Sequence, residues 1–183
     1  MTRQGLKKIL SLLRQGGVAV VPTDTVYGLI ADATQKKAVG RVFAIKKRPR
    51  AKQLPLFVHT MRMAKHYALI SREQELILSS KWPGPYTAVL KRKKCRPQLY
   101  GVHGGTIALR IPDSPKIRLI IKNLKRPVTG TSANRAGKNP SKTVQEARRQ
   151  LGAKPDLFVD GGTLYGRPSR IVDMTAKPYR TLR

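Results

Sequence analysis

Residues 18–29 of this 183-residue chain read Val-Ala-Val-Val-Pro-Thr-Asp-Thr-Val-Tyr-Gly-Leu, an apolar run followed at once by polar groups. The four apolar residues 18–21 predict a short buried strand that Pro22 ends, because proline has no N–H to donate within a sheet. Ligands of open α/β sheets bind at the carboxyl ends of strands, so residues 22–29 form a first candidate binding segment. An ordinary turn capped by Thr and Asp explains the same residues equally well.

Helix and strand patterns alternate along the rest of the chain. Apolar spacing and capping signals, including capping boxes at Ser71 with Gln74 and Thr143 with Glu146, predict helices at 6–13, 36–46, 71–80, 114–124 and after residue 143. Short apolar runs predict strands at 54–59, 86–90, 106–111, 128–129, 157–160 and 170–173. This alternation favours the α/β class, and strands that follow one another without a helix predict a mixed sheet. No repeat or linker interrupts the pattern, so we expect one domain over residues 1–183.

The net charge narrows the class of partner. The chain has 38 Lys+Arg against 9 Asp+Glu, which gives a formal charge of +29. Nucleic acid, nucleotides or phosphate-rich substrates are therefore favoured, and a lysine-rich surface from a compositional bias is the alternative. The 40% of apolar residues is enough for a core, whereas 5% of aromatic residues is too few for a surface that reads single strands mainly by stacking.

Several kinds of site are excluded by the sequence. The one cysteine, Cys95, excludes an internal disulfide framework and a cysteine-rich zinc site, and we interpret it as incidental. The three histidines are scattered and are more typical of structural or surface residues. The loop after Gly130 differs from a Walker A loop, because six residues rather than four separate Gly130 from Gly137. The chain has no apolar run of ~18 residues and no signal-peptide pattern, so we expect a cytoplasmic protein without membrane contact.

Two further polar segments are candidate binding sites. Residues 46–52, which end the second predicted helix, carry Lys46, Arg48 and Lys52, and these cations suit a phosphate. A solvated basic helix end, favoured by the helix dipole, explains them about as well. Residues 130–134, Gly-Thr-Ser-Ala-Asn, let a backbone approach a ligand closely and supply hydroxyl and amide donors, although a plain polar loop is an equal alternative.

Taken together, these segments resemble the YrdC-like family of threonylcarbamoyl-AMP synthases. The family's Lys-x-Arg motif is matched by Lys46 and Arg48, its Ser-x-Asn motif by Ser132 and Asn134, and its Pro-Thr-acid-Thr-x-Tyr-Gly-Leu segment by residues 22–29. Further matches, in the family's order, are at residues 82–87, 108–113, 168–173 and 182–183. The resemblance therefore covers essentially the whole chain.

The resemblance implies an α/β fold, with a twisted open mixed sheet flanked by helices and a basic concave groove. It also implies a nucleotidyltransferase that makes threonylcarbamoyl-AMP and pyrophosphate from ATP, L-threonine and bicarbonate or CO₂. The product would serve threonylcarbamoyladenosine modification of tRNA, completed by a separate transferase complex. Mg²⁺ is expected with the ATP substrate, and no metal is expected to be held by the protein alone.

The resemblance also implies roles for individual residues. Lys46 and Arg48 are the expected catalytic residues. The expected ATP contacts are Lys46, Arg48, Lys52, Thr106, Ser132, Asn134, Ser141 and Arg183. The expected threonine contacts are Thr25, Arg110, Gly130 and Ser169, with Arg110 meeting the carboxylate through a two-pronged bond.

Three departures from the family pattern keep other functions open. Phe57 stands where many relatives have His, and Arg170 stands where the family run has Thr, which adds a cation near the threonine pocket. The extra C-terminal domain of longer relatives is not expected here, so closure of the site would come from loops or a partner. A non-catalytic module that binds double-stranded RNA or tRNA, and a paralogue with another amino-acid or acyl substrate, remain alternatives.

Overall fold

The computed structural model describes residues 2–94 and 97–183, so Cys95 lies outside the described residues. The helices of the described part are α1 (Arg3–Arg14), α2 (Lys36–Lys46), α3 (Met61–Tyr67), α4 (Arg72–Ser79), α5 (Pro115–Leu124) and α6 (Val144–Leu151). The strands are β1 (Ala19–Val21), β2 (Gly28–Ile30), β3 (Leu56–Phe57), β4 (Ala68–Leu69), β5 (Tyr86–Arg92), β6 (Thr106–Arg110), β7 (Val128–Thr129), β8 (Thr131–Ser132), β9 (Leu157–Phe158), β10 (Arg170–Asp173) and β11 (Arg180–Thr181). The α/β class is confirmed.

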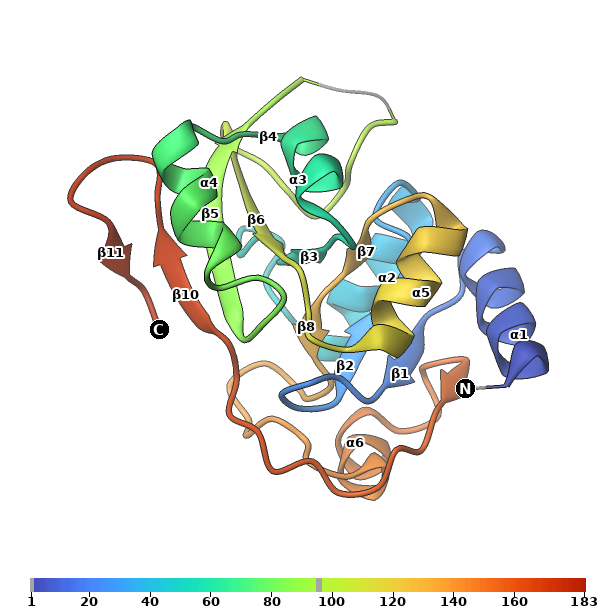
Figure 1. The fold of residues 1–183 in the computed structure, drawn as a ribbon. Helices are drawn as coiled ribbons and strands as arrows, with labels where there is room; N and C mark the ends of the chain where they lie inside the picture. The colour runs from blue at the N-terminus through green and yellow to red at the C-terminus, as the bar shows by residue number, and fades with distance from the viewer. Residues whose placement is uncertain (1, 95–96) are drawn as a thin grey trace.

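The strands form two mixed sheets where the sequence predicted one (Figure 1). The smaller sheet has the order β8-β2-β1-β9, with β1 antiparallel to β2 and parallel to β9. The larger sheet has the order β11-β10-β5-β6-β3-β7, and β4 also pairs with β5. In it β5 runs parallel to β10 and antiparallel to β6. Strands of two residues such as β7 and β8 carry too little pattern to reveal such a division.

The apolar run at 18–21 is buried on both faces of the smaller sheet. Ala19 and Val21 contact the core under α1 and α5, whereas Val18 and Val20 contact the core under α2 and α6. Because side chains alternate across a strand, a strand covered on both faces reads as a continuous apolar run rather than an alternating one. The strand is confirmed, and the polar segment after it turns back into β2, a second strand that the sequence did not predict.

The larger sheet packs against α3 and α4. Its core includes Leu56, Leu78, Trp82 and Leu109, all buried. Helix α4 begins with the predicted capping box, in which the Ser71 hydroxyl accepts from the Gln74 N–H and the Gln74 side chain accepts from the Ser71 N–H.

The capping box predicted for α6 is only half formed. The Thr143 hydroxyl accepts from the Glu146 N–H, as predicted, at 3.1 Å. The Glu146 carboxylate instead accepts from the N–H of Lys142, one residue before the cap, at 2.7 Å. The helix start is therefore correctly predicted, while the second half of the motif is displaced by one residue.

Candidate active site

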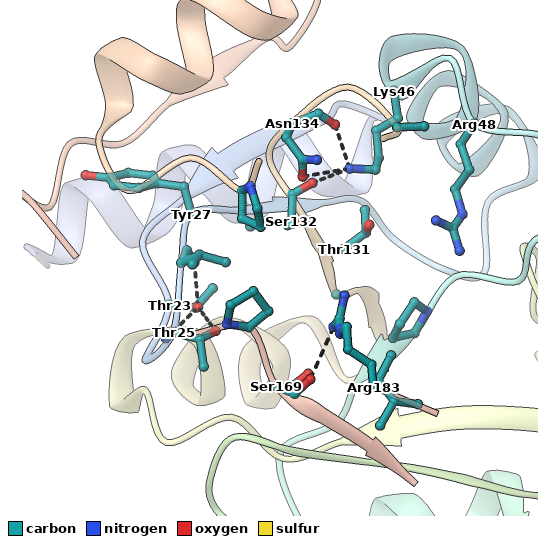
Figure 2. A pocket seen from close by; sticks show the side chains of 18 of the residues that line it. Thr23, Thr25, Tyr27, Lys46, Arg48, Thr131, Ser132, Asn134, Ser169 and Arg183 are labelled. Carbon is teal, nitrogen blue, oxygen red and sulfur yellow. Dashed lines mark hydrogen bonds between the residues drawn. The ribbon is translucent and has the colours of Figure 1, made fainter. Parts of the chain in front are cut away.

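A cavity of about 480 Å³ is lined by residues from both sheets. Ten of the twelve residues that the sequence nominated line it: Thr25, Lys46, Arg48, Lys52, Arg110, Gly130, Ser132, Asn134, Ser169 and Arg183. Figure 2 shows Lys46, Ser132 and Asn134 grouped on one side, and Thr23, Thr25 and Ser169 on the other. Among the residues on its lining, the charged side chains are all cations.

The polar segment between β1 and β2 forms one wall and is fixed by its own hydrogen bonds. The Thr23 hydroxyl donates to the Val26 carbonyl at 2.7 Å and lies 3.0 Å from the Thr25 hydroxyl. The phenol of Tyr27 is buried, donates to the Gly162 carbonyl at 2.7 Å and accepts from the Gly161 N–H at 2.9 Å. Burial raises the pKa of Tyr27. This phenol is therefore an anchor between two chain segments rather than a proton donor to the cavity.

Arg110, on β6, is 3% exposed and is held in one orientation by three protein acceptors. Its guanidinium donates from Nε to the Gly84 carbonyl at 2.8 Å, from Nη2 to Asp24 at 2.5 Å and from Nη1 to the Thr25 hydroxyl at 3.3 Å. Burial lowers the pKa of Arg110, and the Asp24 carboxylate partly offsets that effect. An arginine so fixed presents its remaining N–H groups to a carboxylate without further ordering.

Gly130 and Phe57 meet closely beside Arg110. A Cβ added to Gly130 would lie 2.4 Å from two ring carbons of Phe57, so no larger residue fits here without movement. The Arg110 guanidinium carbon lies 5.5 Å from the centre of the same ring. Phe57 thus supplies an apolar surface beside Arg110.

Lys46, at the end of α2, is 2% exposed and faces protein oxygens. Its ammonium donates to the Ser132 carbonyl, to the Asn134 carbonyl at 2.7 Å and toward the Asn134 side-chain oxygen at 3.4 Å (Figure 2). Burial, followed by the charge of Arg48, lowers the pKa of Lys46 to about 7.

The positive charges of Arg48 and Lys52 are more accessible from the cavity than that of Lys46. Arg48 is half-buried and donates to the carbonyls of Lys52 and Gln53, at 3.0 and 2.7 Å. Burial, followed by the charge of Arg183, lowers the pKa of Arg48. Lys52 is exposed, and its ammonium has no partner within the described ranges.

Thr131 and Ser132, the two residues of β8, line the cavity. Neither Thr131 nor Ser132 has a side-chain hydrogen-bond partner among residues 2–94 and 97–183. The neighbouring Asn134 amide, by contrast, donates to the carbonyls of Arg135 and Lys138, at 2.8 and 2.6 Å. Asn134 therefore shapes the loop, and the hydroxyls are the groups that remain available to a ligand.

Ser169 and Arg183 close the cavity on the side of the larger sheet. The Ser169 hydroxyl lies 2.9 Å from that of Thr87, and the Arg183 guanidinium donates to the Ser169 carbonyl at 3.2 Å. Arg183 also pairs through its backbone with Ile171, which places it beside β10. Arg170 donates to the Thr181 hydroxyl at 2.8 Å and does not line the cavity, so this departure leaves Ser169 in place.

Thr106 and Ser141 lie outside the cavity lining. The Thr106 hydroxyl accepts from the Gln53 amide at 3.0 Å, and the fully buried Ser141 hydroxyl donates to the Ala133 carbonyl at 2.7 Å. Their contact with ATP stays a prediction. Thr131 and Lys138 also line the cavity but were not nominated. Thr131 lies in the polar segment 130–134 that the sequence had marked, whereas Lys138 lies four residues beyond it.

No group of three His, Cys, Asp or Glu side chains suited to a metal ion is present among the described residues. In the same part of the chain, none of the helices has the length and apolar character needed to span a bilayer.

Comparison with known proteins places these features in one family. The Sua5/YciO/YrdC family, described as "telomere recombination", matches residues 11–183. A relative from Yersinia enterocolitica, named threonylcarbamoyl-AMP synthase, is 35% identical over 185 residues, covering 97% of this chain and 96% of its own length.

Solved structures of other proteins in this family are similar to this chain over its whole length. Pyrococcus abyssi Sua5 complexed with L-threonine superimposes with a TM-score of 0.90 at 30% identity, and YciO from E. coli with 0.89 at 25% identity. Each match covers the whole of this chain, which spans 54% of the P. abyssi protein and 89% of YciO. The cavity, its motifs and these likenesses together show that the chain belongs to the Sua5/YciO/YrdC family.

Proposed function

We propose that this protein is an L-threonylcarbamoyladenylate synthase, a nucleotidyltransferase that joins L-threonine, CO₂ or bicarbonate, and ATP. The observation that carries the proposal is one cavity with a fixed guanidinium, Arg110, beside Thr25, and with Arg48, Lys52 and free hydroxyls also on its lining. The name of the Yersinia relative and the threonine bound to P. abyssi Sua5 support it.

Threonine would bind beside Arg110. Its carboxylate would accept from the guanidinium N–H groups that Asp24 and Gly84 leave free, because Arg matches a carboxylate with two parallel bonds. The Thr25 and Ser169 hydroxyls are placed to receive polar atoms, and the Gly130 backbone leaves room that a side chain would fill. Phe57 would pack against the apolar part of the amino acid.

ATP would bind with its phosphates near Arg48, Lys52 and Arg183. These cations draw together groups that repel one another, since both the carbamate and the triphosphate are anionic. The Thr131 and Ser132 hydroxyls add donors that need no reorganisation. A correctly placed donor of this kind contributes about 3 kcal/mol in other enzymes that stabilise a developing anion.

The proposed reaction proceeds in two steps. The threonine amine forms a bond to the carbon of CO₂ and loses a proton, which gives a carbamate. A carbamate oxygen then attacks the α-phosphorus of ATP, and the bond from that phosphorus to the bridging oxygen breaks as pyrophosphate leaves. The attacking oxygen is already anionic, so the step does not require a strong protein base, and charge stabilisation and alignment carry the rate.

Mg²⁺ would enter with ATP. The lining residues of the cavity offer hydroxyl and carbonyl oxygens, and none of those described is a carboxylate. Such a set fits an ion that is held mainly by phosphate oxygens and water, with Thr131 or Ser132 as an added oxygen ligand. The ion would neutralise charge on the triphosphate.

The chemical lability of the proposed product indicates which partner the protein would need. A mixed anhydride between a carbamate and AMP is labile, so a transferase complex that modifies tRNA would consume it promptly. We therefore place the protein in the cytoplasm beside tRNA. A double-stranded RNA or tRNA surface is compatible with the charge of +29, and it adds to the synthase activity rather than replacing it.

The test is direct turnover. The purified protein with ATP, Mg²⁺, bicarbonate and labelled threonine should yield threonylcarbamoyl-AMP and pyrophosphate in equal amounts. Arg48→Ala should abolish both products, whereas Arg149→Ala, an equal loss of charge on the exposed surface of α6, should leave the rate within about twofold of the original.

A panel of other amino acids in the same assay separates the remaining alternatives. Pyrophosphate release with another amino acid, and none with threonine, would identify a paralogue. A folded sample that releases no pyrophosphate with any amino acid, and still binds RNA, would identify the non-catalytic module and refute the proposal.

A further inference from the structure

In its protonated form, the side chain of Lys46 has no N–H left for a substrate. A lysine ammonium carries three N–H donors, and no more. Here the three acceptors are the Ser132 carbonyl, the Asn134 carbonyl at 2.7 Å and the Asn134 side-chain oxygen at 3.4 Å. All three belong to β8 and the loop that follows it, so the side chain joins the end of α2 to that loop.

The backbone of Lys46 binds the same loop. Its carbonyl accepts from the Ala136 N–H at 2.9 Å. The loop is also tied within itself, because the Asn134 amide donates to the carbonyls of Arg135 and Lys138. Lys46 therefore fastens residues 132–136 at two points, one at its backbone and one at the tip of its side chain.

Movement of this ammonium to a phosphate is disfavoured by what it would leave behind. Lys46 is 2% exposed and Asn134 is 6% exposed, so the two Asn134 acceptor oxygens have little access to water, while Ser132 is half-buried. A buried carbonyl that loses its donor bears the cost of desolvation without a partner. A phosphate, meanwhile, has the more accessible Arg48, Lys52 and Lys138 on the same lining.

We infer that Lys46 is a positioning residue that holds residues 131–138 in place, so that the Thr131 and Ser132 hydroxyls face the cavity, and that it does not contact the phosphates itself. The inference rests on the proposed function only for the identity of the ligand. The role of Lys46 in holding the loop is a property of the ligand-free protein. An experiment can therefore refute this role without refuting the proposed function, and the reverse is also true.

The first test uses the free protein. Lys46→Met keeps the length of the side chain and removes the donors, and Lys47→Met removes the same charge from an exposed neighbour. Hydrogen exchange at the amides of residues 131–138 should accelerate at least tenfold in Lys46→Met and less than twofold in Lys47→Met. Equal exchange in the two variants would overturn the fastening role, whether or not ATP binds.

The second test needs no variant. In a crystal structure of the unmodified protein with ATP and Mg²⁺, the Lys46 ammonium should stay within hydrogen-bond distance of the Ser132 and Asn134 carbonyls, and phosphate oxygens should lie on Arg48 or Lys52. An ammonium that has moved onto a phosphate oxygen would overturn the inference. If ATP does not bind at all, the proposed function fails, and the exchange experiment still decides the role of Lys46.

Kinetics separate positioning from plain folding. The melting temperature of Lys46→Met should stay within a few degrees of that of the unmodified protein, which shows that the variant is folded. Its kcat should fall at least tenfold, while its KM for threonine changes less than threefold. A loss confined to the KM for ATP would instead show a direct phosphate contact and contradict the inference.

Discussion

Gly130 is a residue on the cavity lining that has no room for a Cβ. A Cβ there would lie 2.4 Å from the Phe57 ring, which is 3% exposed and packed against the core of α1 and α5. Real Cβ atoms do not approach so closely, so either the ring or the β7–β8 connection must move. Because the same ring lies beside Arg110, that movement would reach the proposed threonine pocket.

Gly130→Ala should therefore raise the KM for threonine at least tenfold. Gly40→Ala is the matched control, since the nearest atom to its added Cβ is 3.9 Å away and alanine favours the interior of a helix by roughly 0.5–1 kcal/mol. Steady-state kinetics of both variants provide the measurement. Phe57→Leu added to Gly130→Ala should recover part of the loss, and a double variant as impaired as the single one would point away from the ring.

The planar guanidinium of Arg110 is expected to determine how the carboxylate of the proposed substrate binds. Arg110→Lys keeps the charge and removes the planar fork that Gly84, Asp24 and Thr25 hold in place. We expect kcat/KM for threonine to fall by at least tenfold, with the KM for ATP unchanged, and Arg149→Lys to behave like the unmodified protein. A rise in the KM for ATP alone would move Arg110 to the nucleotide side.

At the scale of elements, residues 159–169, which connect β9 to β10, form a strap that packs against the first polar segment, residues 22–29. A Cβ on Gly166 would lie 2.5 Å from the Thr25 carbonyl, and one on Gly161 would lie 2.5 Å from Pro22. Tyr27 binds the same strap through Gly161 and Gly162. The strap thus holds the wall that carries Thr25, and its glycines permit the close approach.

Gly166→Ala should push the strap away from Thr25 and weaken threonine binding several-fold. Tyr165→Ala, which changes the adjacent residue, is the control, because that side chain is 86% exposed. Calorimetric titration with threonine would measure both. Equal affinities in the two variants would show that the strap does not set the position of Thr25.

Elements were predictable where a local pattern is long enough to determine them. The sequence located α1, α2, α5 and the capping box of α4, because apolar spacing and caps act within a few residues of each other. It missed β2 and β8, whose residues the sequence had marked as polar segments. The strand β8 exists because it pairs with β2, Gly28 with Ser132, over a hundred residues apart, and β2 pairs on its other side with β1.

At the scale of the whole molecule, the charge is far from balanced. Against 38 cations the chain has nine acids, and Asp24 and Asp32 among them are consumed by ion pairs with Arg110 and Arg126 inside or beside the core. Most of the positive charge therefore has no acidic partner. Such a surface binds polyanions through release of their counterions, and that binding depends on salt.

Binding of double-stranded RNA should weaken steeply and linearly on a plot of log affinity against log salt concentration. Fluorescence anisotropy between 50 and 300 mM NaCl would measure the slope, and a duplex of another sequence should give the same line, because phosphates carry no sequence information. Negligible affinity even at 50 mM salt would instead indicate a lysine-rich composition with no RNA partner.

The sequence by itself determined the class of fold, the order of the main elements and ten of the residues that line the cavity. It could do so because helix periodicity, caps and short motifs such as Lys46-x-Arg48 are local, and the resemblance to a known family rests on such motifs in the same order. Ten of the twelve nominated residues accordingly meet at one cavity.

The tertiary structure alone decided what each of those residues faces. Lys46 and Arg48 look alike in sequence, as cations two positions apart at a helix end, and both line the cavity. Yet the Lys46 ammonium donates to carbonyls 86 and 88 residues away, whereas Arg48 donates to the carbonyls of Lys52 and Gln53, which are close to it in sequence. Likewise, nothing local shows that Asp24 holds Arg110 or that Phe57 fills the space beside Gly130. The physical reason is that the three N–H donors of an ammonium, or the space around a Cβ, are used up by whichever atoms the folded chain brings near.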